Sequence, residues 1–295
     1  VADGSDPRVF GVTHLYIGLK TFEGSTGADA WKGFGYDIDA QVTTDDFSAH
    51  CRPNGGAASA SVFPDAPDGV DNSFGRAILP ILKTAFASTS PDLEEELNLV
   101  IVNGDRTLLF DLSALGPGAS YSAVASSFFE GKTRTGTTWL KSPEFFDGDQ
   151  PRLMFPDAYL TDNVWVSRRV DGVLTVNLDM GYPIPLAIHR PLVTAELSPD
   201  HQAVTRGLIS GVLDTAQFVE AMRTVLESAD ERFCNGATIQ GILNQFRGAS
   251  DIMKDGSQVS TATCNGISIG LGFTAEAVAL GGFAAPETPA PDPCD

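Results

Sequence analysis

The chain opens with segments in which apolar and polar positions alternate, a pattern typical of strands with one buried face. Alternating or short apolar runs recur through the first two thirds of the sequence, at residues 9–19, 106–112, 121–129, 152–155, 163–167 and 184–197. Asp171-Gly172 separates the runs 164–166 and 173–178, and Asp-Gly in such a place is a strong hairpin signal. The pattern predicts that strands dominate residues 8–197.

A helical spacing of apolar residues replaces the alternation later in the chain. Asp214 and Gln217 form a capping-box pattern at the start of this region. The apolar stripes that follow contain Phe218, Met222, Val225, Leu226, Ile239, Ile242, Leu243 and Phe246. A similar stripe over residues 74–86 contains Pro80, which predicts a kink or a break in that helix.

The order of the elements favours one mixed domain over repeated βαβ units, because a helical segment at about 203–247 is followed by a closing strand at 267–273. We expect a mainly β fold with packed helices, of the α+β class, with an antiparallel β-sandwich or jelly-roll-like body. The closing strand is expected to return to that body, so residues 8–285 form a single globular domain. A flexible lead, residues 1–7, precedes it, and a proline-rich tail, residues 286–295, follows it.

The composition is acidic, with 38 Asp and Glu residues, 19 Lys and Arg residues and a formal net charge of −19. A chain with this charge and no basic run repels nucleic acid, so no nucleic-acid partner is expected. Hydrophobic residues make up 42% of the chain, which is ordinary for a globular protein. No apolar stretch reaches the roughly 18 residues of a membrane-spanning helix, so no transmembrane segment is predicted.

Four cysteines, none of them in a C-x-x-C pair, indicate two disulfides. We expect Cys234 to pair with Cys264, because the two close a loop of about 30 residues, and Cys51 to pair with Cys294 by elimination. Disulfides form in oxidising compartments. The chain begins at Val1, as expected of a mature protein whose signal peptide has been removed. We therefore expect export to the periplasm, the outer surface or the extracellular space.

Gly266-Ile-Ser268-Ile-Gly270 matches G-x-S-x-G, the nucleophile motif of α/β-hydrolases. That motif needs a helix after the serine and a histidine later in the chain, but the last histidine is His201 and the residues after Ser268 keep alternating. Ser268 is therefore predicted to be structural, and its replacement by Ala to leave folding almost unchanged. No catalytic residue is predicted.

Two short acidic segments are candidates for a calcium site. The candidate ligands are Asp37, Asp39, Asp65, Asp68 and Asp71. Calcium takes six to eight oxygen ligands, several of them from short acidic side chains on loops. The alternative is a turn that ends in a helix cap, in which Asp, Asn and Gly are also favoured. A third acidic turn, residues 251–256, lies between Cys234 and Cys264, and we predict that it is a structural turn held by their disulfide.

Several stretches resemble secreted or lipid-anchored proteins of myxobacteria and their relatives, which occur as many paralogues. These are DGVDNSFG at 68–75, ILPIL at 78–82, ASDIM at 249–253, CNGISIG at 264–270 and the Asp-x-Asp at 37–39. The resemblance extends from about Trp31 to Phe273 and implies export, with no associated activity. The lipobox cysteine of such proteins would precede or begin the mature chain, and position 1 is Val1, so the residues do not themselves predict a lipid anchor.

Two functions from different classes follow from these features. The first is an exported, non-enzymatic surface or periplasmic protein that binds an unknown protein or carbohydrate ligand or forms part of an assembly, with possible stabilisation by calcium. The alternative is a secreted hydrolase that acts on polysaccharide with paired carboxylates as acid and nucleophile or base. A cleft that holds one desolvated carboxylate about 5 to 10 Å from another would favour the hydrolase.

Overall fold

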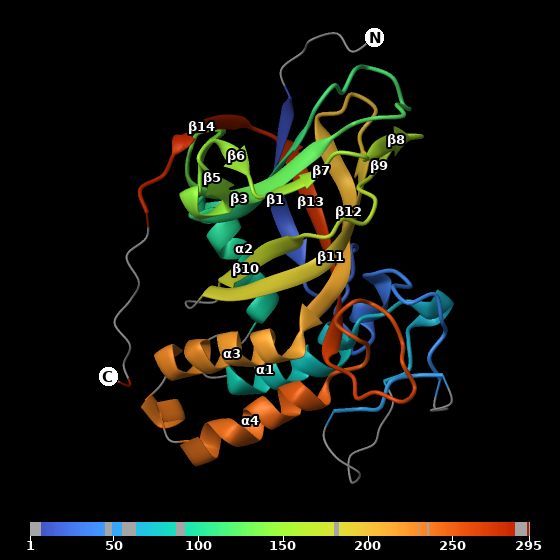
Figure 1. Ribbon diagram of the computed structural model, residues 1–295. Helices are drawn as coiled ribbons and strands as arrows, with labels where there is room; N and C mark the ends of the chain where they lie inside the picture. The colour runs from blue at the N-terminus through green and yellow to red at the C-terminus, as the bar shows by residue number, and fades with distance from the viewer. Residues whose placement is uncertain are drawn as a thin grey trace.

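The computed structural model describes residues 7–44, 49–54, 63–86, 92–179, 183–229, 231–234, 236–286 and 294 (Figure 1). Twelve strands form one large sheet: β1 Arg8–Tyr16, β2 Arg106–Leu112, β3 Ser126–Thr135, β4 Thr138–Lys141, β7 Leu153–Phe155, β8 Tyr159–Thr161, β9 Val164–Val166, β10 Val173–Asp179, β11 Pro183–Leu197, β12 Ala203–Asp214, β13 Gly266–Ala277 and β14 Ala279–Phe283. Two short strands, β5 Phe146–Asp147 and β6 Gln150–Pro151, pair with each other. The mainly β, α+β class is confirmed.

The sheet has the strand order β14-β4-β3-β2-β1-β13-β12-β11-β9-β8, with β10 also beside β11 and β7 also beside β3. All its strand pairs are antiparallel except β14 with β4. The strands therefore do not separate into the two sheets expected of a sandwich or jelly roll. The reason lies in β11, which has 15 residues and pairs with β10 near its start and with β9 near its end.

The hairpin predicted at Asp171-Gly172 is wrong. Strand β9 pairs with β8 and with β11, whereas β10 pairs with β11 alone among the described strands. A two-residue Asp-Gly hairpin requires a positive φ at the glycine, and Gly172 is not among the glycines with positive φ. The turn instead moves the chain from one end of β11 to the other.

The described residues contain four α-helices: α1 Leu79–Ala85, α2 Leu93–Asn103, α3 Thr215–Ala229 and α4 Gly236–Gly248. Helices α2 and α3 pack against the sheet, and α4 packs against α3. Shorter helical turns are η1 Ala30–Gly33, η2 Pro67–Gly69, η3 Phe74–Ile78, η4 Pro143–Phe145 and η5 Glu231–Cys234. The predicted kink or break at Pro80 is a change in hydrogen-bond pattern and not a break, because the backbone stays helical where the π-helical turn ends at Ile78 and α1 begins at Leu79, with Pro80 in its first turn. In Figure 1, α1, α3 and α4 lie together below the sheet.

The helical segment is shorter than predicted, because residues 203–214 form strand β12 between β11 and β13. Helix α3 begins at the predicted cap: the Asp214 carboxylate accepts hydrogen bonds from the backbone N–H groups of Ala216 and Gln217. The apolar periodicity was informative only from Phe218 onward. Before it, pairing with two neighbouring strands decides the conformation.

The main core lies on the concave side of the sheet, where aromatic side chains from distant strands meet. Phe110 stacks on Phe128 with ring centroids 4.9 Å apart and meets the edge of Phe273 at 5.9 Å. Trp165 is fully buried beside them. Among the described residues, no helix is long and apolar enough to cross a membrane.

Candidate functional site

Three loops from distant parts of the sequence meet at one end of β12 and β13. They are residues 35–43, residues 63–73 and residues 249–265, which lie together at the lower right of Figure 1. Asn72 ties the second loop to β13 and to the residues just before the first loop: its amide nitrogen donates to the carbonyls of Trp31, Phe34 and Gly270, and its amide oxygen accepts from the N–H of Gly270. A Cβ at Gly270 would lie 2.3 Å from the Phe34 carbonyl oxygen, so only glycine permits this approach.

Three of the five predicted ligands converge in these loops. Asp37, Asp39 and Asp71 each offer an oxygen atom, and the three atoms lie within 4.8 Å of one another, so the triad could hold a metal ion. Asp71 is buried, and its carboxylate accepts a hydrogen bond from the Ile38 N–H at 2.6 Å. Asp37 is exposed and accepts from the Ala40 N–H.

The other two predicted ligands differ from each other. Asp65 lies beside the triad, where its carboxylate shares a hydrogen bond with Asp71 and accepts another from the Thr43 N–H. Asp68 is exposed on the turn η2, with a φ of 63°, and is not part of the triad. The segment 65–72 therefore contains both a group of carboxylates and a turn, the two alternatives predicted for it. Asp65 and Asp71 lie in the carboxylate cluster, and Asp68 lies on the turn η2.

Asp251 lies near this carboxylate cluster, although the sequence-based prediction placed it only in a structural turn. Its carboxylate accepts hydrogen bonds from the backbone N–H and the hydroxyl of Ser268, and its charge acts on Asp71. Ser268 is fully buried in β13 and also accepts a hydrogen bond from the Ser73 N–H at 2.8 Å. Ser268 thus has the structural role that was predicted, and the turn at 251–256 adds a carboxylate to the cluster.

The acidic loop cluster is defined as Asp37, Asp39, Asp65, Asp71 and Asp251. Its electrostatics are those of carboxyl groups that form no ion pair among the described residues, since the nearby Arg169 donates to the carbonyls of Asp37 and Ile38 instead. Burial raises the pKa of Asp71 to about 9, and the charges of Asp39 and Asp251 add to the shift. Burial also raises the pKa values of Asp65 and Asp251 to about 7 each. The pKa of Asp39 is raised by burial as well. Within the described part of the chain, no Lys or Arg forms an ion pair with any of the five.

The disulfides differ from the predicted pairing: Cys51 binds Cys264, and Cys234 binds Cys294. The first disulfide is buried beside the acidic loop cluster, where the backbone N–H of Cys264 also donates to the carbonyl of Arg52. The second is exposed and ties the end of the chain to the turn η5. Loop length favoured Cys234 with Cys264, but Cys264 lies at the loop before β13 and Cys234 between α3 and α4.

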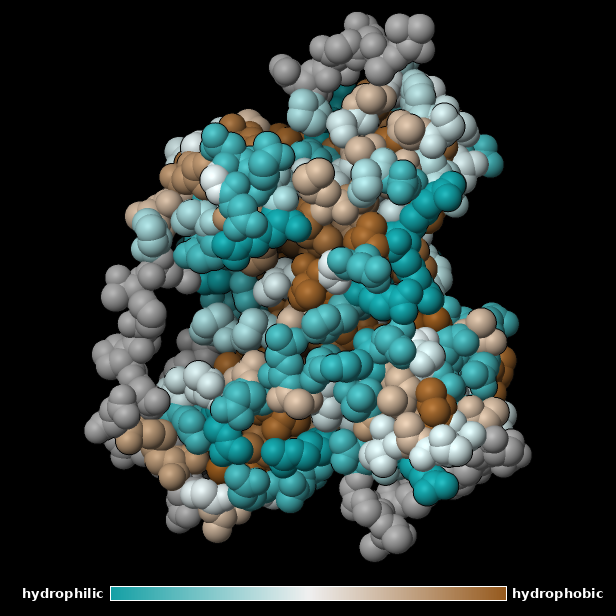
Figure 2. Space-filling view, viewed as in Figure 1, coloured by the Kyte–Doolittle hydropathy of each residue, from teal (hydrophilic) through white to brown (hydrophobic). Residues whose placement is uncertain are grey.

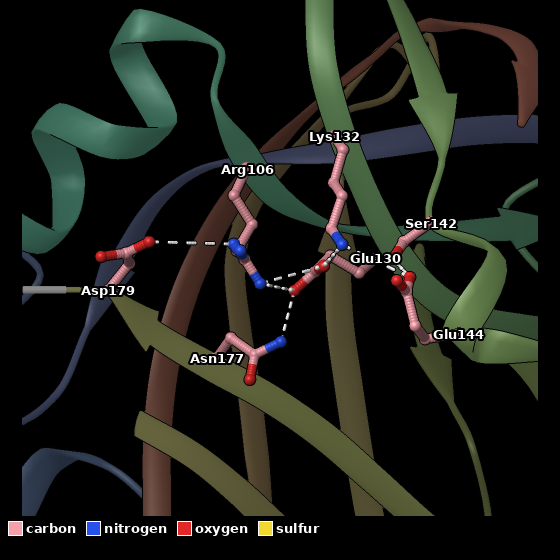
Figure 3. A network of polar contacts seen from close by, with 7 residues as sticks. All are labelled: Arg106, Glu130, Lys132, Ser142, Glu144, Asn177 and Asp179. Carbon is pink, nitrogen blue, oxygen red and sulfur yellow. Dashed lines mark hydrogen bonds and ion pairs between the residues drawn. The ribbon is translucent and has the colours of Figure 1, made fainter. Parts of the chain in front are cut away.

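A second group of buried charges lies inside the curled sheet and is shown in Figure 3. This strand network consists of Arg106, Glu130, Lys132, Ser142, Glu144, Asn177 and Asp179. Arg106 contacts Glu130 at 3.1 Å, and Lys132 contacts Glu130 at 3.7 Å and Glu144 at 3.3 Å. The network spans the space from β2 and β3 to β10, because Asn177 donates a hydrogen bond from β10 to Glu130.

The strand network keeps Glu144 ionised, in contrast to the carboxyl groups of the acidic loop cluster. Although partial burial by itself raises the pKa of Glu144, the Ser142 hydroxyl, a backbone N–H and Lys132 together lower that pKa to about 2. Glu144 therefore cannot serve as a proton donor at neutral pH. The sequence contains one signal for this network. Phe128, Glu130 and Lys132 alternate along β3 and therefore share one face, so two charged side chains lie on the same face as a buried aromatic residue.

Comparison with known proteins gave no match to a family model, to a curated protein or to a solved structure.

Proposed function

We propose that this chain is an exported, non-enzymatic binding or structural protein whose acidic loops are stabilised by a bound calcium ion. The convergence of Asp37, Asp39 and Asp71 within 4.8 Å carries the calcium part of the proposal. Two oxygen atoms on opposite sides of a calcium ion, each about 2.4 Å from it, are about 4.8 Å apart. The spacing of the three carboxylates is therefore compatible with a single shared calcium ion.

The charge of the cluster supports a divalent cation. Without one, the raised pKa values of Asp65, Asp71 and Asp251 mean that protons neutralise the buried carboxylates. A calcium ion would take the place of those protons, because it favours the ionised form of each ligand. Oxygen-only ligands on irregular loops suit calcium better than zinc, which prefers nitrogen and sulfur.

The two disulfides support export. Disulfides persist in oxidising compartments and are rare in the cytosol. Here they join segments far apart in sequence, separated by 213 residues for Cys51–Cys264 and 60 residues for Cys234–Cys294. Extracellular calcium sites are generally weak, with dissociation constants of about 10⁻⁴ to 10⁻³ M, and a site of that strength would be filled only where calcium is plentiful.

The hydrolase alternative receives less support from the same carboxylates. Asp71 has the strongly raised pKa that a general acid needs, but it is 2% exposed and engaged with the N–H of Ile38. Glu144 is half exposed but remains ionised. Asp71, which holds a proton, is therefore inaccessible, and Glu144, which is accessible, holds none. Asp65 is half-buried with a pKa raised to about 7, but its carboxylate is engaged with the Thr43 N–H and with Asp71, so a binding function is the stronger proposal.

Thermal unfolding in calcium or in chelator tests the proposal. At calcium a hundredfold above its dissociation constant, binding adds about 2.7 kcal/mol to the free energy of unfolding, which corresponds to a rise in Tm of about 5 to 10 °C. The matched variants are Asp39→Asn and Asp68→Asn, which remove one carboxylate from inside and from outside the triad. We expect Asp39→Asn to lose most of the calcium response and Asp68→Asn to keep it.

Magnesium serves as the control ion, because it demands a smaller, near-octahedral set of ligands. We expect a smaller rise in Tm with magnesium than with calcium at the same concentration. An equal Tm in calcium and in chelator, together with no heat of binding in calorimetry, would contradict the calcium proposal.

A further inference from the structure

Strand β10 has an open edge, and two prolines on β11 show which main-chain groups face it. Pro185 and Pro183 lie opposite Asn177 and Asp179 in the register of β10 with β11. Antiparallel pairs alternate between hydrogen-bonded and non-hydrogen-bonded positions, and proline has no N–H to donate. The proline positions are therefore the non-hydrogen-bonded ones, and Leu174, Val176 and Leu178 make the bonds to β11.

It follows that Val173, Thr175 and Asn177 direct their main-chain N–H and C=O groups away from β11. In the described part of the chain, no other main-chain or side-chain group bonds to the main chain of these three residues on that side. The open edge runs over about 13 Å from Val173 to Asn177, at about 3.3 Å per residue. Strand β10 thus offers a short row of unused donors and acceptors.

The open edge lines a cavity of about 440 Å³. Its opposite wall comes from β3 and β7, through Phe128 and Leu153, and its rim carries Glu144. In Figure 2, hydrophobic side chains are visible in the recess between the upper and lower parts of the molecule, surrounded by hydrophilic ones. Apolar contact and backbone hydrogen bonds are therefore available in one place.

Nothing in the sequence of β10 protects this edge. Open edges are commonly protected against pairing with another chain by prolines, lysines, bulges or a short strand. Strand β8 has only three residues, and β14 contains Gly281 and Gly282. Strand β10 has seven residues, VLTVNLD, without proline, lysine or glycine. Its edge is recessed instead, so it excludes a broad sheet from another molecule but admits one extended chain.

We infer that the open edge of β10 binds an extended peptide segment of a partner protein by strand addition, with apolar side chains against Phe128 and Leu153 and a basic side chain toward Glu144. Strand addition obtains affinity from main-chain hydrogen bonds and specificity from pockets for alternate side chains. The rim favours a basic partner, since Glu144 is 46% exposed and the chain has a net charge of −19. Both charged rim side chains already have an internal partner, since Glu144 contacts Lys132 at 3.3 Å and Arg152 contacts Asp147 at 2.9 Å, so the net charge of the chain decides the preference for a basic partner.

This inference goes beyond the calcium proposal and involves none of the residues of the acidic loop cluster. Loss of the calcium response leaves peptide binding untouched, and failure of peptide binding leaves the calcium response untouched. Separate measurements on one preparation therefore distinguish the two.

The test uses octapeptides selected from a random phage-displayed library and then synthesised, with binding measured by fluorescence anisotropy. Thr175→Pro replaces the outward N–H with a ring and removes no bond to β11, whereas Thr175→Val keeps the N–H and the shape of the side chain. We expect selected peptides to alternate β-branched and basic residues. Their Kd should rise at least tenfold in Thr175→Pro and stay within twofold in Thr175→Val.

Amide hydrogen exchange on the wild-type protein gives a readout that does not depend on a variant. Bound peptide should slow exchange at Thr175 and Asn177 at least tenfold, and leave Val176 unchanged because its N–H already binds β11. If Thr175→Pro does not fold, the exchange pattern at residues 175–177 of the wild-type protein is the sole test of the inference. The inference is overturned if no peptide is enriched above a protein-free support, if Thr175→Pro binds as tightly as the wild type, or if exchange at Thr175 and Asn177 stays unchanged.

Discussion

The acidic loop cluster and the strand network contain the same kind of side chain in opposite electrostatic states. In the loops, Asp71 is surrounded by other carboxylates and by backbone N–H groups, and its pKa rises to about 9. In the strand network, Glu144 on the turn η4 accepts a hydrogen bond from the Ser142 hydroxyl and contacts Lys132 of β3, and its pKa falls to about 2. A cation, Arg169, lies near the loops, but it donates to the backbone carbonyls of Asp37 and Ile38 and forms no ion pair with the carboxylates among the described residues.

The difference arises from how the two regions hold their side chains. Strand β3 fixes Glu130 and Lys132 two residues apart on one face, and β2 brings Arg106 across to them. The loops have no such periodicity, and they are fixed by Asn72, by the Cys51–Cys264 disulfide and by hydrogen bonds to the carboxylates. Regular strands can therefore carry their own counter-charges, while irregular loops are suited to receive an ion.

The largest expected effect is the pH dependence of the chelated protein. The folded-state pKa values of Asp65, Asp71 and Asp251 lie above 3.8, so the folded state binds more protons than the unfolded state between about pH 4 and pH 9. This stabilisation is complete below pH 4 and is lost as pH rises through about 7 and about 9. We expect the free energy of unfolding to fall by about 4 kcal/mol or more from pH 4 to pH 8, since one pKa unit is worth about 1.4 kcal/mol.

Urea unfolding at a series of pH values, in chelator and in calcium, measures this dependence. Calcium should restore most of the lost stability above pH 7, where the carboxylates are free to bind it. If the stability of the chelated protein is constant from pH 4 to pH 8, these carboxylates are already ionised at pH 4. That result would contradict the proposed difference between the acidic loop cluster and the strand network.

Removal of the internal cation of the strand network should have the next largest effect. Arg106→Met leaves Glu130, 4% exposed, without its closest cation. We expect a loss of about 3 kcal/mol, because an unpaired buried charge is costly. Urea unfolding measures it, and the double variant Arg106→Met with Glu130→Gln should recover most of the loss. No recovery in the double variant would show that Arg106 acts through packing instead.

A smaller effect is expected at the junction between the acidic loop cluster and the sheet. Ser268→Ala removes the hydroxyl that donates to Asp251 and accepts from the Ser73 N–H. The structure changes the sequence-based expectation of almost unchanged folding, since an unsatisfied buried group costs about 1 to 3 kcal/mol. Thermal unfolding measures the loss, with Ser257→Ala, on an exposed turn, as the matched control. Equal effects of the two variants would contradict a special role for Ser268.

The smallest effect is expected at the rim of the strand network. Glu144→Gln keeps an acceptor for the Ser142 hydroxyl and removes a charge that is 46% exposed. Solvent screening limits such a pair to about 1 kcal/mol or less. Because the pKa of Glu144 is about 2 when folded and its ordinary value is 4.5, the difference from the wild type should be constant between pH 6 and pH 9 and should shrink as pH falls below about 5. A difference that grows with pH in the constant range would show that Glu144 titrates there.

Local patterns in the sequence determined the class of the fold and the position of several elements. The short apolar run at 106–112 became strand β2 with those bounds, Pro80 marked a change from π-helical to α-helical hydrogen bonding, and Asp214 does cap α3. Each of these depends on interactions within a few residues, so a short window contains the necessary information. The acidic segments were also identified correctly as a place where carboxylates gather.

Only the tertiary structure decided which distant segments meet. Strand β11 pairs with β10 and β9 and prevents the predicted hairpin, and Cys51 reaches Cys264 across 213 residues. Asp251 joined the acidic loop cluster and Asp68 did not, although Asp68 is much closer in sequence to Asp71. The physical reason is that strand register and loop packing set these distances, and both are fixed by the burial of side chains from the whole chain at once.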